Sequence, residues 1–178
     1  MNRIVTILIA VATLVSCGGT RKKSATPQAV EPLFYTYEVV AEYPHLRTSY
    51  TQGLQFVDGE LWEGTGEWGE SVLQKIDLES GKAEVLARLP QTEFGEGITV
   101  LGDKVFQLTW TNNTAHIYDR SGRLLSNARY AGEGWGLTSD GEKLYMSNGT
   151  STIYRINPAT FSRESKVTVT LRGAPLEM

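Results

Sequence analysis

The sequence predicts an all-β fold, a β-propeller of which about three blades are present, and three observations carry this prediction. A pattern of short strands and tight turns occurs three times along the chain. Its period is close to that of a propeller blade. No window has apolar residues at helical spacing for more than about one turn, which disfavours helical repeats of similar length.

Each copy of the pattern contains a hairpin. A short apolar strand leads into a tight turn, and a second strand rich in aromatic and β-branched residues follows. The copies are 50–66, 95–110 and 132–150, and their turns are Asp58-Gly59, Gly102-Asp103 and Asp140-Gly141. Each unit is closed by a further strand that ends in Asp77, Asp119 or Asn157.

The period follows from equivalent residues in the three copies. Gly53, Gly97 and Gly136 are 44 and 39 residues apart. Repeats of roughly 40 to 45 residues that carry four short strands are typical of propeller blades. An additional strand is predicted over Tyr35 to Glu42, before the first repeat.

Closed propellers have about 4 to 8 blades, whereas the chain has room for three blades and the additional strand. An open, incomplete ring would leave strand edges unpaired and is prone to aggregation. The sequence therefore favours a fragment of a longer propeller over an open ring.

The N-terminus has the features of an export signal. Arg3 precedes an apolar run from Ile4 to Val15, which is short for a membrane-spanning helix. The run ends at Leu14-Val15-Ser16-Cys17, the pattern of a bacterial lipoprotein signal, so Cys17 is the predicted site of lipidation. The alternative is a plain signal peptide with a coincidental cysteine.

Three regions are predicted: a signal peptide over 1–17, a flexible linker over 18–32 and a partial propeller domain over 33–178. The location expected for the domain is the cell envelope, lipid-anchored on the periplasmic or outer side of a bacterial membrane.

Composition excludes several function classes. The formal net charge is −3 and Lys and Arg are not clustered, so no nucleic-acid partner is expected. Cys17 is the sole cysteine, which excludes a disulfide within the domain. His45 and His116 have no acidic or Cys neighbours at ligand spacing, so neither a metal site nor a cofactor is expected.

Five strings resemble the glutamine cyclotransferase family in order and spacing: Tyr50-Thr51-Gln52-Gly53-Leu54, Leu61 to Gly66, Phe94-Gly95-Glu96-Gly97-Ile98-Thr99, Gln107 to Trp110, and Gly134 to Gly141. Tyr50 departs from the family's more common Phe. The resemblance implies a five-bladed propeller that converts the N-terminal glutamine of peptides to pyroglutamate and releases ammonia. Peptides with N-terminal Gln are accordingly the expected partners.

This chemistry needs orientation and proton transfer. The α-amine attacks the side-chain amide of its own residue, so nucleophile and electrophile are already tethered. The amine must lose a proton and the leaving nitrogen must gain one, which suits one carboxylate with a raised pKa. Glu96 matches the catalytic Glu of the family; taken alone, a Gly-Glu-Gly triplet would be a solvated loop charge.

Other residues receive binding or structural roles. Gln52 could hydrogen-bond the substrate amide or cap a strand end. Trp110, Trp135 and Tyr50 could wall the pocket, although aromatic residues are also frequent in propeller cores. Trp62 and Trp68 are predicted to belong to the core and Glu63 to make a structural hydrogen bond.

The family's remaining pocket groups, an Asn, a Trp and a basic residue, come from strings that follow the region resembled here. The resemblance thus implies that this chain carries one side of a cyclase pocket. The competing hypotheses are an inactive envelope propeller that binds peptide or sugar and an unstable fragment without a function of its own.

Overall fold

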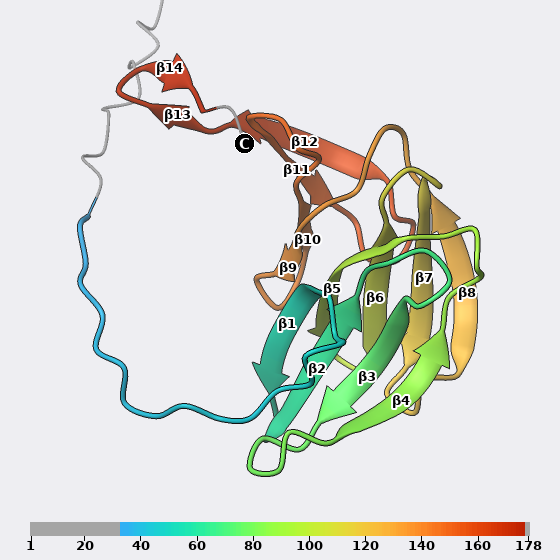
Figure 1. Cartoon of the computed structure of the whole chain (residues 1–178). Helices are drawn as coiled ribbons and strands as arrows, with labels where there is room; N and C mark the ends of the chain where they lie inside the picture. Colours follow the sequence, from blue (N-terminus) through green and yellow to red (C-terminus); the bar gives the residue numbers. More distant parts are fainter. Residues whose placement is uncertain (1–32, 177–178) are drawn as a thin grey trace, which may run out of the picture. The chain divides into compact units, whose positions relative to one another are not determined.

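The computed structural model describes residues 33–176, and all regular elements in this range are strands. Within this range there is no helix that could cross a membrane. The predicted all-β propeller architecture is confirmed, since three four-stranded antiparallel sheets follow one another along the chain (Figure 1). The signal peptide, the linker and Cys17 lie outside the described residues.

The first sheet consists of β1 (Thr51–Val57), β2 (Glu60–Thr65), β3 (Val72–Ile76) and β4 (Ala83–Arg88). The second consists of β5 (Gly95–Leu101), β6 (Lys104–Thr109), β7 (Thr114–Asp119) and β8 (Leu124–Arg129). The third consists of β9 (Leu137–Ser139), β10 (Leu144–Met146), β11 (Thr152–Ile156) and β12 (Arg163–Thr168). In each sheet the spatial order equals the chain order, as in a propeller blade.

The predicted hairpins are present at the predicted turns. In the first, Asp58 and Gly59 have φ values of 52° and 82°. Two consecutive positive φ values match the twist of antiparallel strands, and Asp-Gly tolerates them well. This turn sets the register in which Val57 lies opposite Glu60 and Phe56 opposite Leu61.

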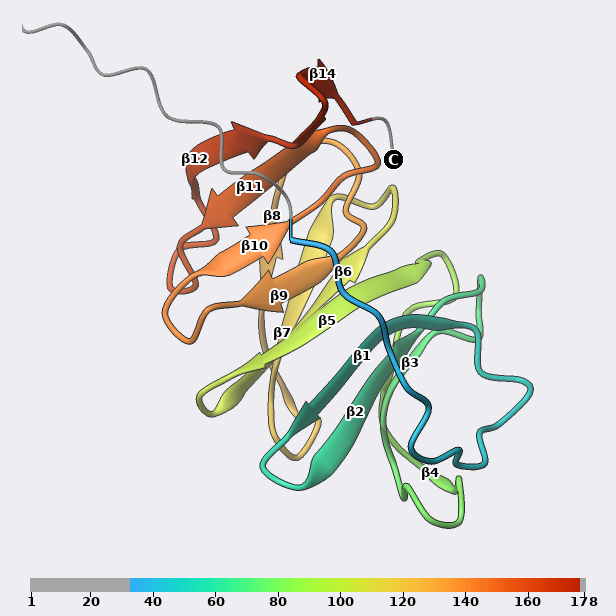
Figure 2. The same ribbon diagram turned by 90° about the vertical axis from the view of Figure 1, so that its left-hand side faces the viewer.

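The innermost strands β1, β5 and β9 lie next to one another (Figure 2). The equivalent glycines of the three repeats, Gly53, Gly97 and Gly136, are called the repeat glycines, and two of them make this approach possible. A Cβ on Gly97 would lie 2.5 Å from both the amide nitrogen of Leu137 and the carbonyl oxygen of Trp135. A Cβ on Gly53 would likewise meet the amide nitrogen of Ile98.

Two apolar clusters fill the spaces between the sheets. The cluster between the first and second sheets contains the fully buried Trp62, as predicted for this residue. The cluster between the second and third sheets includes Phe106, Leu144 and Met146. Burial of these side chains against the neighbouring sheet is the main stabilising contribution.

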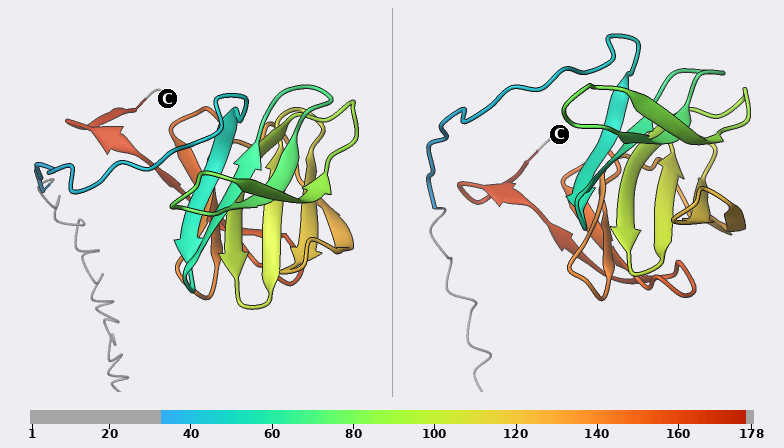
Figure 3. Two further views of the ribbon diagram at one scale, coloured as in Figure 1. Left: turned by 60° about the horizontal axis from the view of Figure 1, so that its bottom comes forward. Right: turned by 90° about the horizontal axis from the view of Figure 1, so that it is seen from below.

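Two structural predictions were wrong. Residues 35–42 form no strand, because no described strand offers them the backbone partners that a ladder requires. Trp68 is 48% exposed and packs on Phe94 instead of the core, because it lies in the loop after β2. A hairpin that was not predicted, β13 (Thr170–Leu171) with β14 (Ala174–Pro175), extends from β12 (Figure 3).

Candidate active site

The inner strands bring equivalent residues of the three repeats together. Each repeat glycine is preceded by a predicted site residue, namely Gln52 in the first repeat, Glu96 in the second and Trp135 in the third. The adjacent inner strands hold these positions close to one another: the Gly97 amide, next to Glu96, donates to the Trp135 carbonyl oxygen at 2.8 Å. Gly53 and Gly97, which lie against backbone atoms of the neighbouring inner strand, therefore set the spacing of the site.

A cavity of about 420 Å³ lies where these residues meet. All five residues predicted for catalysis and substrate binding line it, together with two others. The lining residues are Tyr50, Gln52, Glu67, Phe94, Glu96, Trp110 and Trp135.

Phe94 connects the aromatic side chains of this cavity. Its ring makes edge contacts with Tyr50, Trp68 and Trp110, with centroids 6.2, 5.7 and 5.9 Å away. Such edge-to-face pairs fix ring orientation as well as burying apolar surface. A Cβ on Gly66 would collide with the Phe94 ring, so glycine at this position leaves room for the pocket wall.

Glu96 is the partly buried carboxylate of the cavity. Desolvation by its surroundings, and to a smaller extent the negative charge of Glu133, raise its pKa to about 7. A carboxyl group with this pKa exchanges protons readily near neutral pH, which is the property required of a proton shuttle.

Glu133 lies in the loop before β9 and is exposed. Its Oε2 atom accepts hydrogen bonds from Nε1 of Trp110 at 2.8 Å and from Nε1 of Trp135 at 2.9 Å. These two bonds, with the Trp135 bond contributing more, lower the pKa of Glu133. Glu133 therefore stays ionised beside a carboxyl group whose pKa is raised.

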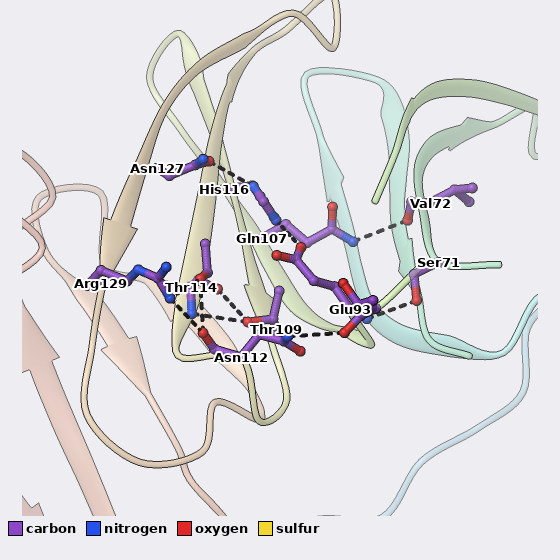
Figure 4. A network of polar contacts seen from close by, with 12 residues as sticks. Ser71, Val72, Glu93, Gln107, Thr109, Asn112, Thr114, His116, Asn127 and Arg129 are labelled. Atoms are coloured by element: carbon purple, nitrogen blue, oxygen red, sulfur yellow. Dashed lines mark hydrogen bonds and ion pairs between the residues drawn. The ribbon is translucent and has the colours of Figure 1, made fainter. Parts of the chain in front are cut away.

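A buried polar network lies next to this site, around the segment that leads into β5 (Figure 4). His116 Nε2 contacts Glu93 Oε2 at 2.5 Å, and His116 Nδ1 contacts the side-chain oxygen of Asn127 at 2.8 Å. The Gly95 amide donates to Ser71 Oγ at 2.9 Å. Two residues that precede Glu96, Glu93 and Gly95, are thus tied to neighbouring strands and loops.

The two histidines, expected to lack acidic neighbours along the sequence, each contact one glutamate in space. His116 pairs with Glu93, and His45 Nε2 lies 3.0 Å from the fully buried Glu63. Glu63 also accepts hydrogen bonds from Gln74 and Thr51, which confirms the predicted structural hydrogen bond. Residues 33–176 contain no group of three or more His, Cys, Asp or Glu side chains able to hold a metal ion.

Sequence reasoning missed three residues of the site. Phe94 and Glu67 line the cavity, and Glu133 accepts hydrogen bonds from two of its lining residues. Phe94 directly precedes the Gly95-Glu96-Gly97 string, and Glu133 lies in a second Gly-Glu-Gly string. These positions could have been found from the strings, whereas nothing in the sequence marks Glu67.

A larger hollow of about 590 Å³ lies along β2, β3 and β4 near Tyr43. Two of its charged groups form an ion pair, since Lys75 Nζ lies 2.5 Å from Glu60 Oε1. The smaller cavity, with a carboxyl group of raised pKa and aromatic walls, is the better candidate for chemistry.

Comparison with known proteins decides the family. The model for glutamine cyclotransferase matches residues 8–178. The chain belongs to the glutamine cyclotransferase family. A glutaminyl-peptide cyclotransferase of Arabidopsis thaliana is 43% identical over 141 residues, which cover 76% of this chain and 43% of the relative.

Solved structures agree with this membership. The Myxococcus xanthus glutaminyl cyclase matches with a TM-score of 0.70 and 34% identity, over 79% of this chain and 60% of that chain. The WD40 repeats of RRP9 match with a TM-score of 0.54 and 13% identity, over 72% of this chain and 41% of that chain, which shows a shared fold alone. The chain thus spans less than two thirds of the length of the family relatives that it matches.

Proposed function

We propose that the protein carrying this chain is a glutaminyl-peptide cyclotransferase, an acyltransferase that converts the N-terminal glutamine of peptides to pyroglutamate and releases ammonia. Membership of the family supports this activity. The observation that carries the proposal is the position of Glu96, a carboxyl group of pKa about 7 in an aromatic cavity.

Glu96 is the proposed proton shuttle. In its ionised form it accepts a proton from the attacking α-amine. It then donates that proton to the departing amide nitrogen, which leaves as ammonia when the ring has closed. One group can perform both transfers because the two nitrogens bond to the same carbon during the reaction.

The other lining groups bind and orient the substrate. Gln52 hydrogen-bonds the side-chain amide, and Tyr50, Trp110 and Trp135 enclose the glutamine side chain so that the amine stays close to its target. Phe94, at the centre of the aromatic contacts, keeps Tyr50 and Trp110 in place.

The proposed location is the cell envelope, with the domain held to a membrane by a lipid on Cys17. The support is the Leu14-to-Cys17 string that follows an apolar run. Labelling with a radioactive fatty acid tests it: the wild-type protein incorporates label, and Cys17→Ala does not. Equal labelling of both proteins would refute this proposal.

Substrate discrimination tests the proposed reaction. A peptide with N-terminal Gln should yield ammonia and a pyroglutamyl product, measured by a coupled ammonia assay and mass spectrometry. The same peptide with N-terminal Asn should not react, because ring closure would give a strained four-membered ring. An N-acetylated Gln peptide should not react either, because its amine is blocked.

Each control excludes another reaction. Ammonia release from the acetylated peptide would indicate amide hydrolysis and contradict cyclisation. Saturable binding of the Gln peptide without any turnover would instead support a peptide-binding propeller.

A further inference from the structure

We infer that Glu133 is a positioning residue that locks the indole walls of Trp110 and Trp135 into one orientation for substrate binding. The inference deepens the proposed function and rests on it for its kinetic consequences. Glu133 does not line the cavity; it acts through the two residues that do. Its carboxylate accepts hydrogen bonds from the indole N–H groups of both.

A single carboxylate oxygen joins two separate parts of the chain. Trp110 follows β6 in the second sheet, and Trp135 precedes β9 in the third. Both indole N–H groups converge on Glu133 Oε2, at 2.8 and 2.9 Å. A charged acceptor makes these hydrogen bonds stronger than neutral ones.

Backbone contacts alone would leave the rings free to turn. The Trp110 amide donates to the Phe94 carbonyl oxygen at 2.9 Å, and the Trp135 amide donates to the Ser147 carbonyl oxygen at 3.0 Å. These bonds place the two Cα atoms but do not define χ1 and χ2 of the side chains. Phe94 contacts the Trp110 ring and Gly149 lies against the Trp135 ring, and the Glu133 carboxylate adds a hydrogen bond that holds each indole N–H.

The loop that carries Glu133 is itself held in place. The Gly134 amide donates to the Trp110 carbonyl oxygen at 3.1 Å, and a Cβ on Gly134 would collide with the Tyr130 hydroxyl. That hydroxyl accepts a hydrogen bond from the Thr109 amide at 3.1 Å and donates to the Thr109 carbonyl oxygen. Glu133 is thus anchored to the same strand end as Trp110.

The Glu133 charge also acts on Glu96. Burial is the larger cause of the raised pKa of Glu96, and repulsion by Glu133 adds to it. The other titratable groups around Glu96 are Tyr50 and Glu67 in the cavity lining and Tyr130 after β8. Within residues 33–176 the lining contains no Lys or Arg.

Two substitutions separate these effects. Glu133→Gln keeps an amide oxygen that can accept the indole N–H groups but removes the charge. Glu133→Ala removes both. Glu142→Gln and Glu142→Ala are the matched controls, because Glu142 is an exposed glutamate in the turn at the other end of β9.

The first readout does not depend on activity. In a ¹H–¹⁵N NMR spectrum, the indole resonances of Trp110 and Trp135, assigned with Trp→Phe variants, should move in Glu133→Ala. The resonance of Trp62, buried between the first and second sheets, should stay in place. Unmoved Trp110 and Trp135 resonances would overturn the inference whatever the enzyme does.

The second readout is kinetic. Glu133→Ala should raise KM for a Gln peptide about tenfold, since wall groups that are no longer oriented lose binding free energy. Glu133→Gln should keep KM within about twofold but move the low-pH limb of kcat/KM to lower pH, because loss of the charge lowers the pKa of Glu96. Equal KM values for wild type and Glu133→Ala would contradict the positioning role of Glu133. A low-pH limb that stays in place in Glu133→Gln would contradict the action of its charge on Glu96.

Failure of the proposed function gives a different result. Wild-type protein that forms no pyroglutamate, while the two indole resonances still move in Glu133→Ala, would refute the cyclotransferase proposal and support the hydrogen-bonded bridge.

Discussion

Glu96 combines two surroundings that raise the free energy of its ionised form, a partly apolar cavity and the nearby charge of Glu133. Its folded-state pKa of about 7 lies above the ordinary 4.5. Below pH 4.5 the carboxyl is protonated in both folded and unfolded chains. Between pH 4.5 and 7 the unfolded chain releases the proton first, so the folded state loses stability as pH rises.

This linkage predicts that Glu96→Gln stabilises the fold at alkaline pH. The gain should be about 1 to 2 kcal/mol at pH 8, after discounting for the partial exposure of the side chain, and close to zero at pH 4. Urea unfolding of both proteins at the two pH values measures it. The exposed Glu142→Gln variant should show no such pH-dependent difference.

An equal free energy of unfolding for wild type and Glu96→Gln at pH 8 would show that Glu96 ionises without penalty. Its pKa would then be ordinary, and the argument for a proton shuttle at neutral pH would fail.

At the scale of strands, the repeat glycines determine how closely the inner strands approach. A Cβ at position 97 would meet two backbone atoms, the Leu137 nitrogen and the Trp135 oxygen, at 2.5 Å. At position 136, in contrast, the nearest atom is the Ser147 side-chain oxygen at 3.1 Å. The first contact cannot relax without moving a strand, whereas the second can relax by a small side-chain shift.

Gly97→Ala should therefore destabilise the protein by about 1 to 3 kcal/mol, and Gly136→Ala by less than about 1 kcal/mol. Urea unfolding of the two variants under the same conditions checks this order. Equal decreases in the free energy of unfolding of the two variants would mean that Gly97 is not needed for the contact between β5 and β9.

The elements that could be predicted from sequence were those with local causes. The Asp58-Gly59 turn follows from residues that tolerate positive φ, and the alternation of strand and turn reveals the hairpins. The strand expected over 35–42 depended on a remote partner, so local pattern was insufficient for it. Trp68 was assigned to the core by residue type, whereas its loop position leaves it exposed.

At the scale of the molecule, repetition relates the residues of the site to one another. The site residues were predicted from the resemblance to the family, and Gln52, Glu96 and Trp135 prove to occupy equivalent places, each before the repeat glycine of its repeat. The Glu133 bridge was not predictable in this way. It depends on two indole rings from different sheets that point to one oxygen, which no spacing along the chain encodes.

Turnover of a Gln-initiated peptide by Glu96→Gln tests the proton-shuttle role of Glu96. Gln has nearly the same shape but cannot accept and return a proton, so kcat should fall about 10²- to 10⁴-fold, while KM changes little. Glu142→Gln should retain wild-type turnover. A Glu96→Gln protein that forms pyroglutamate at the wild-type rate would contradict the account.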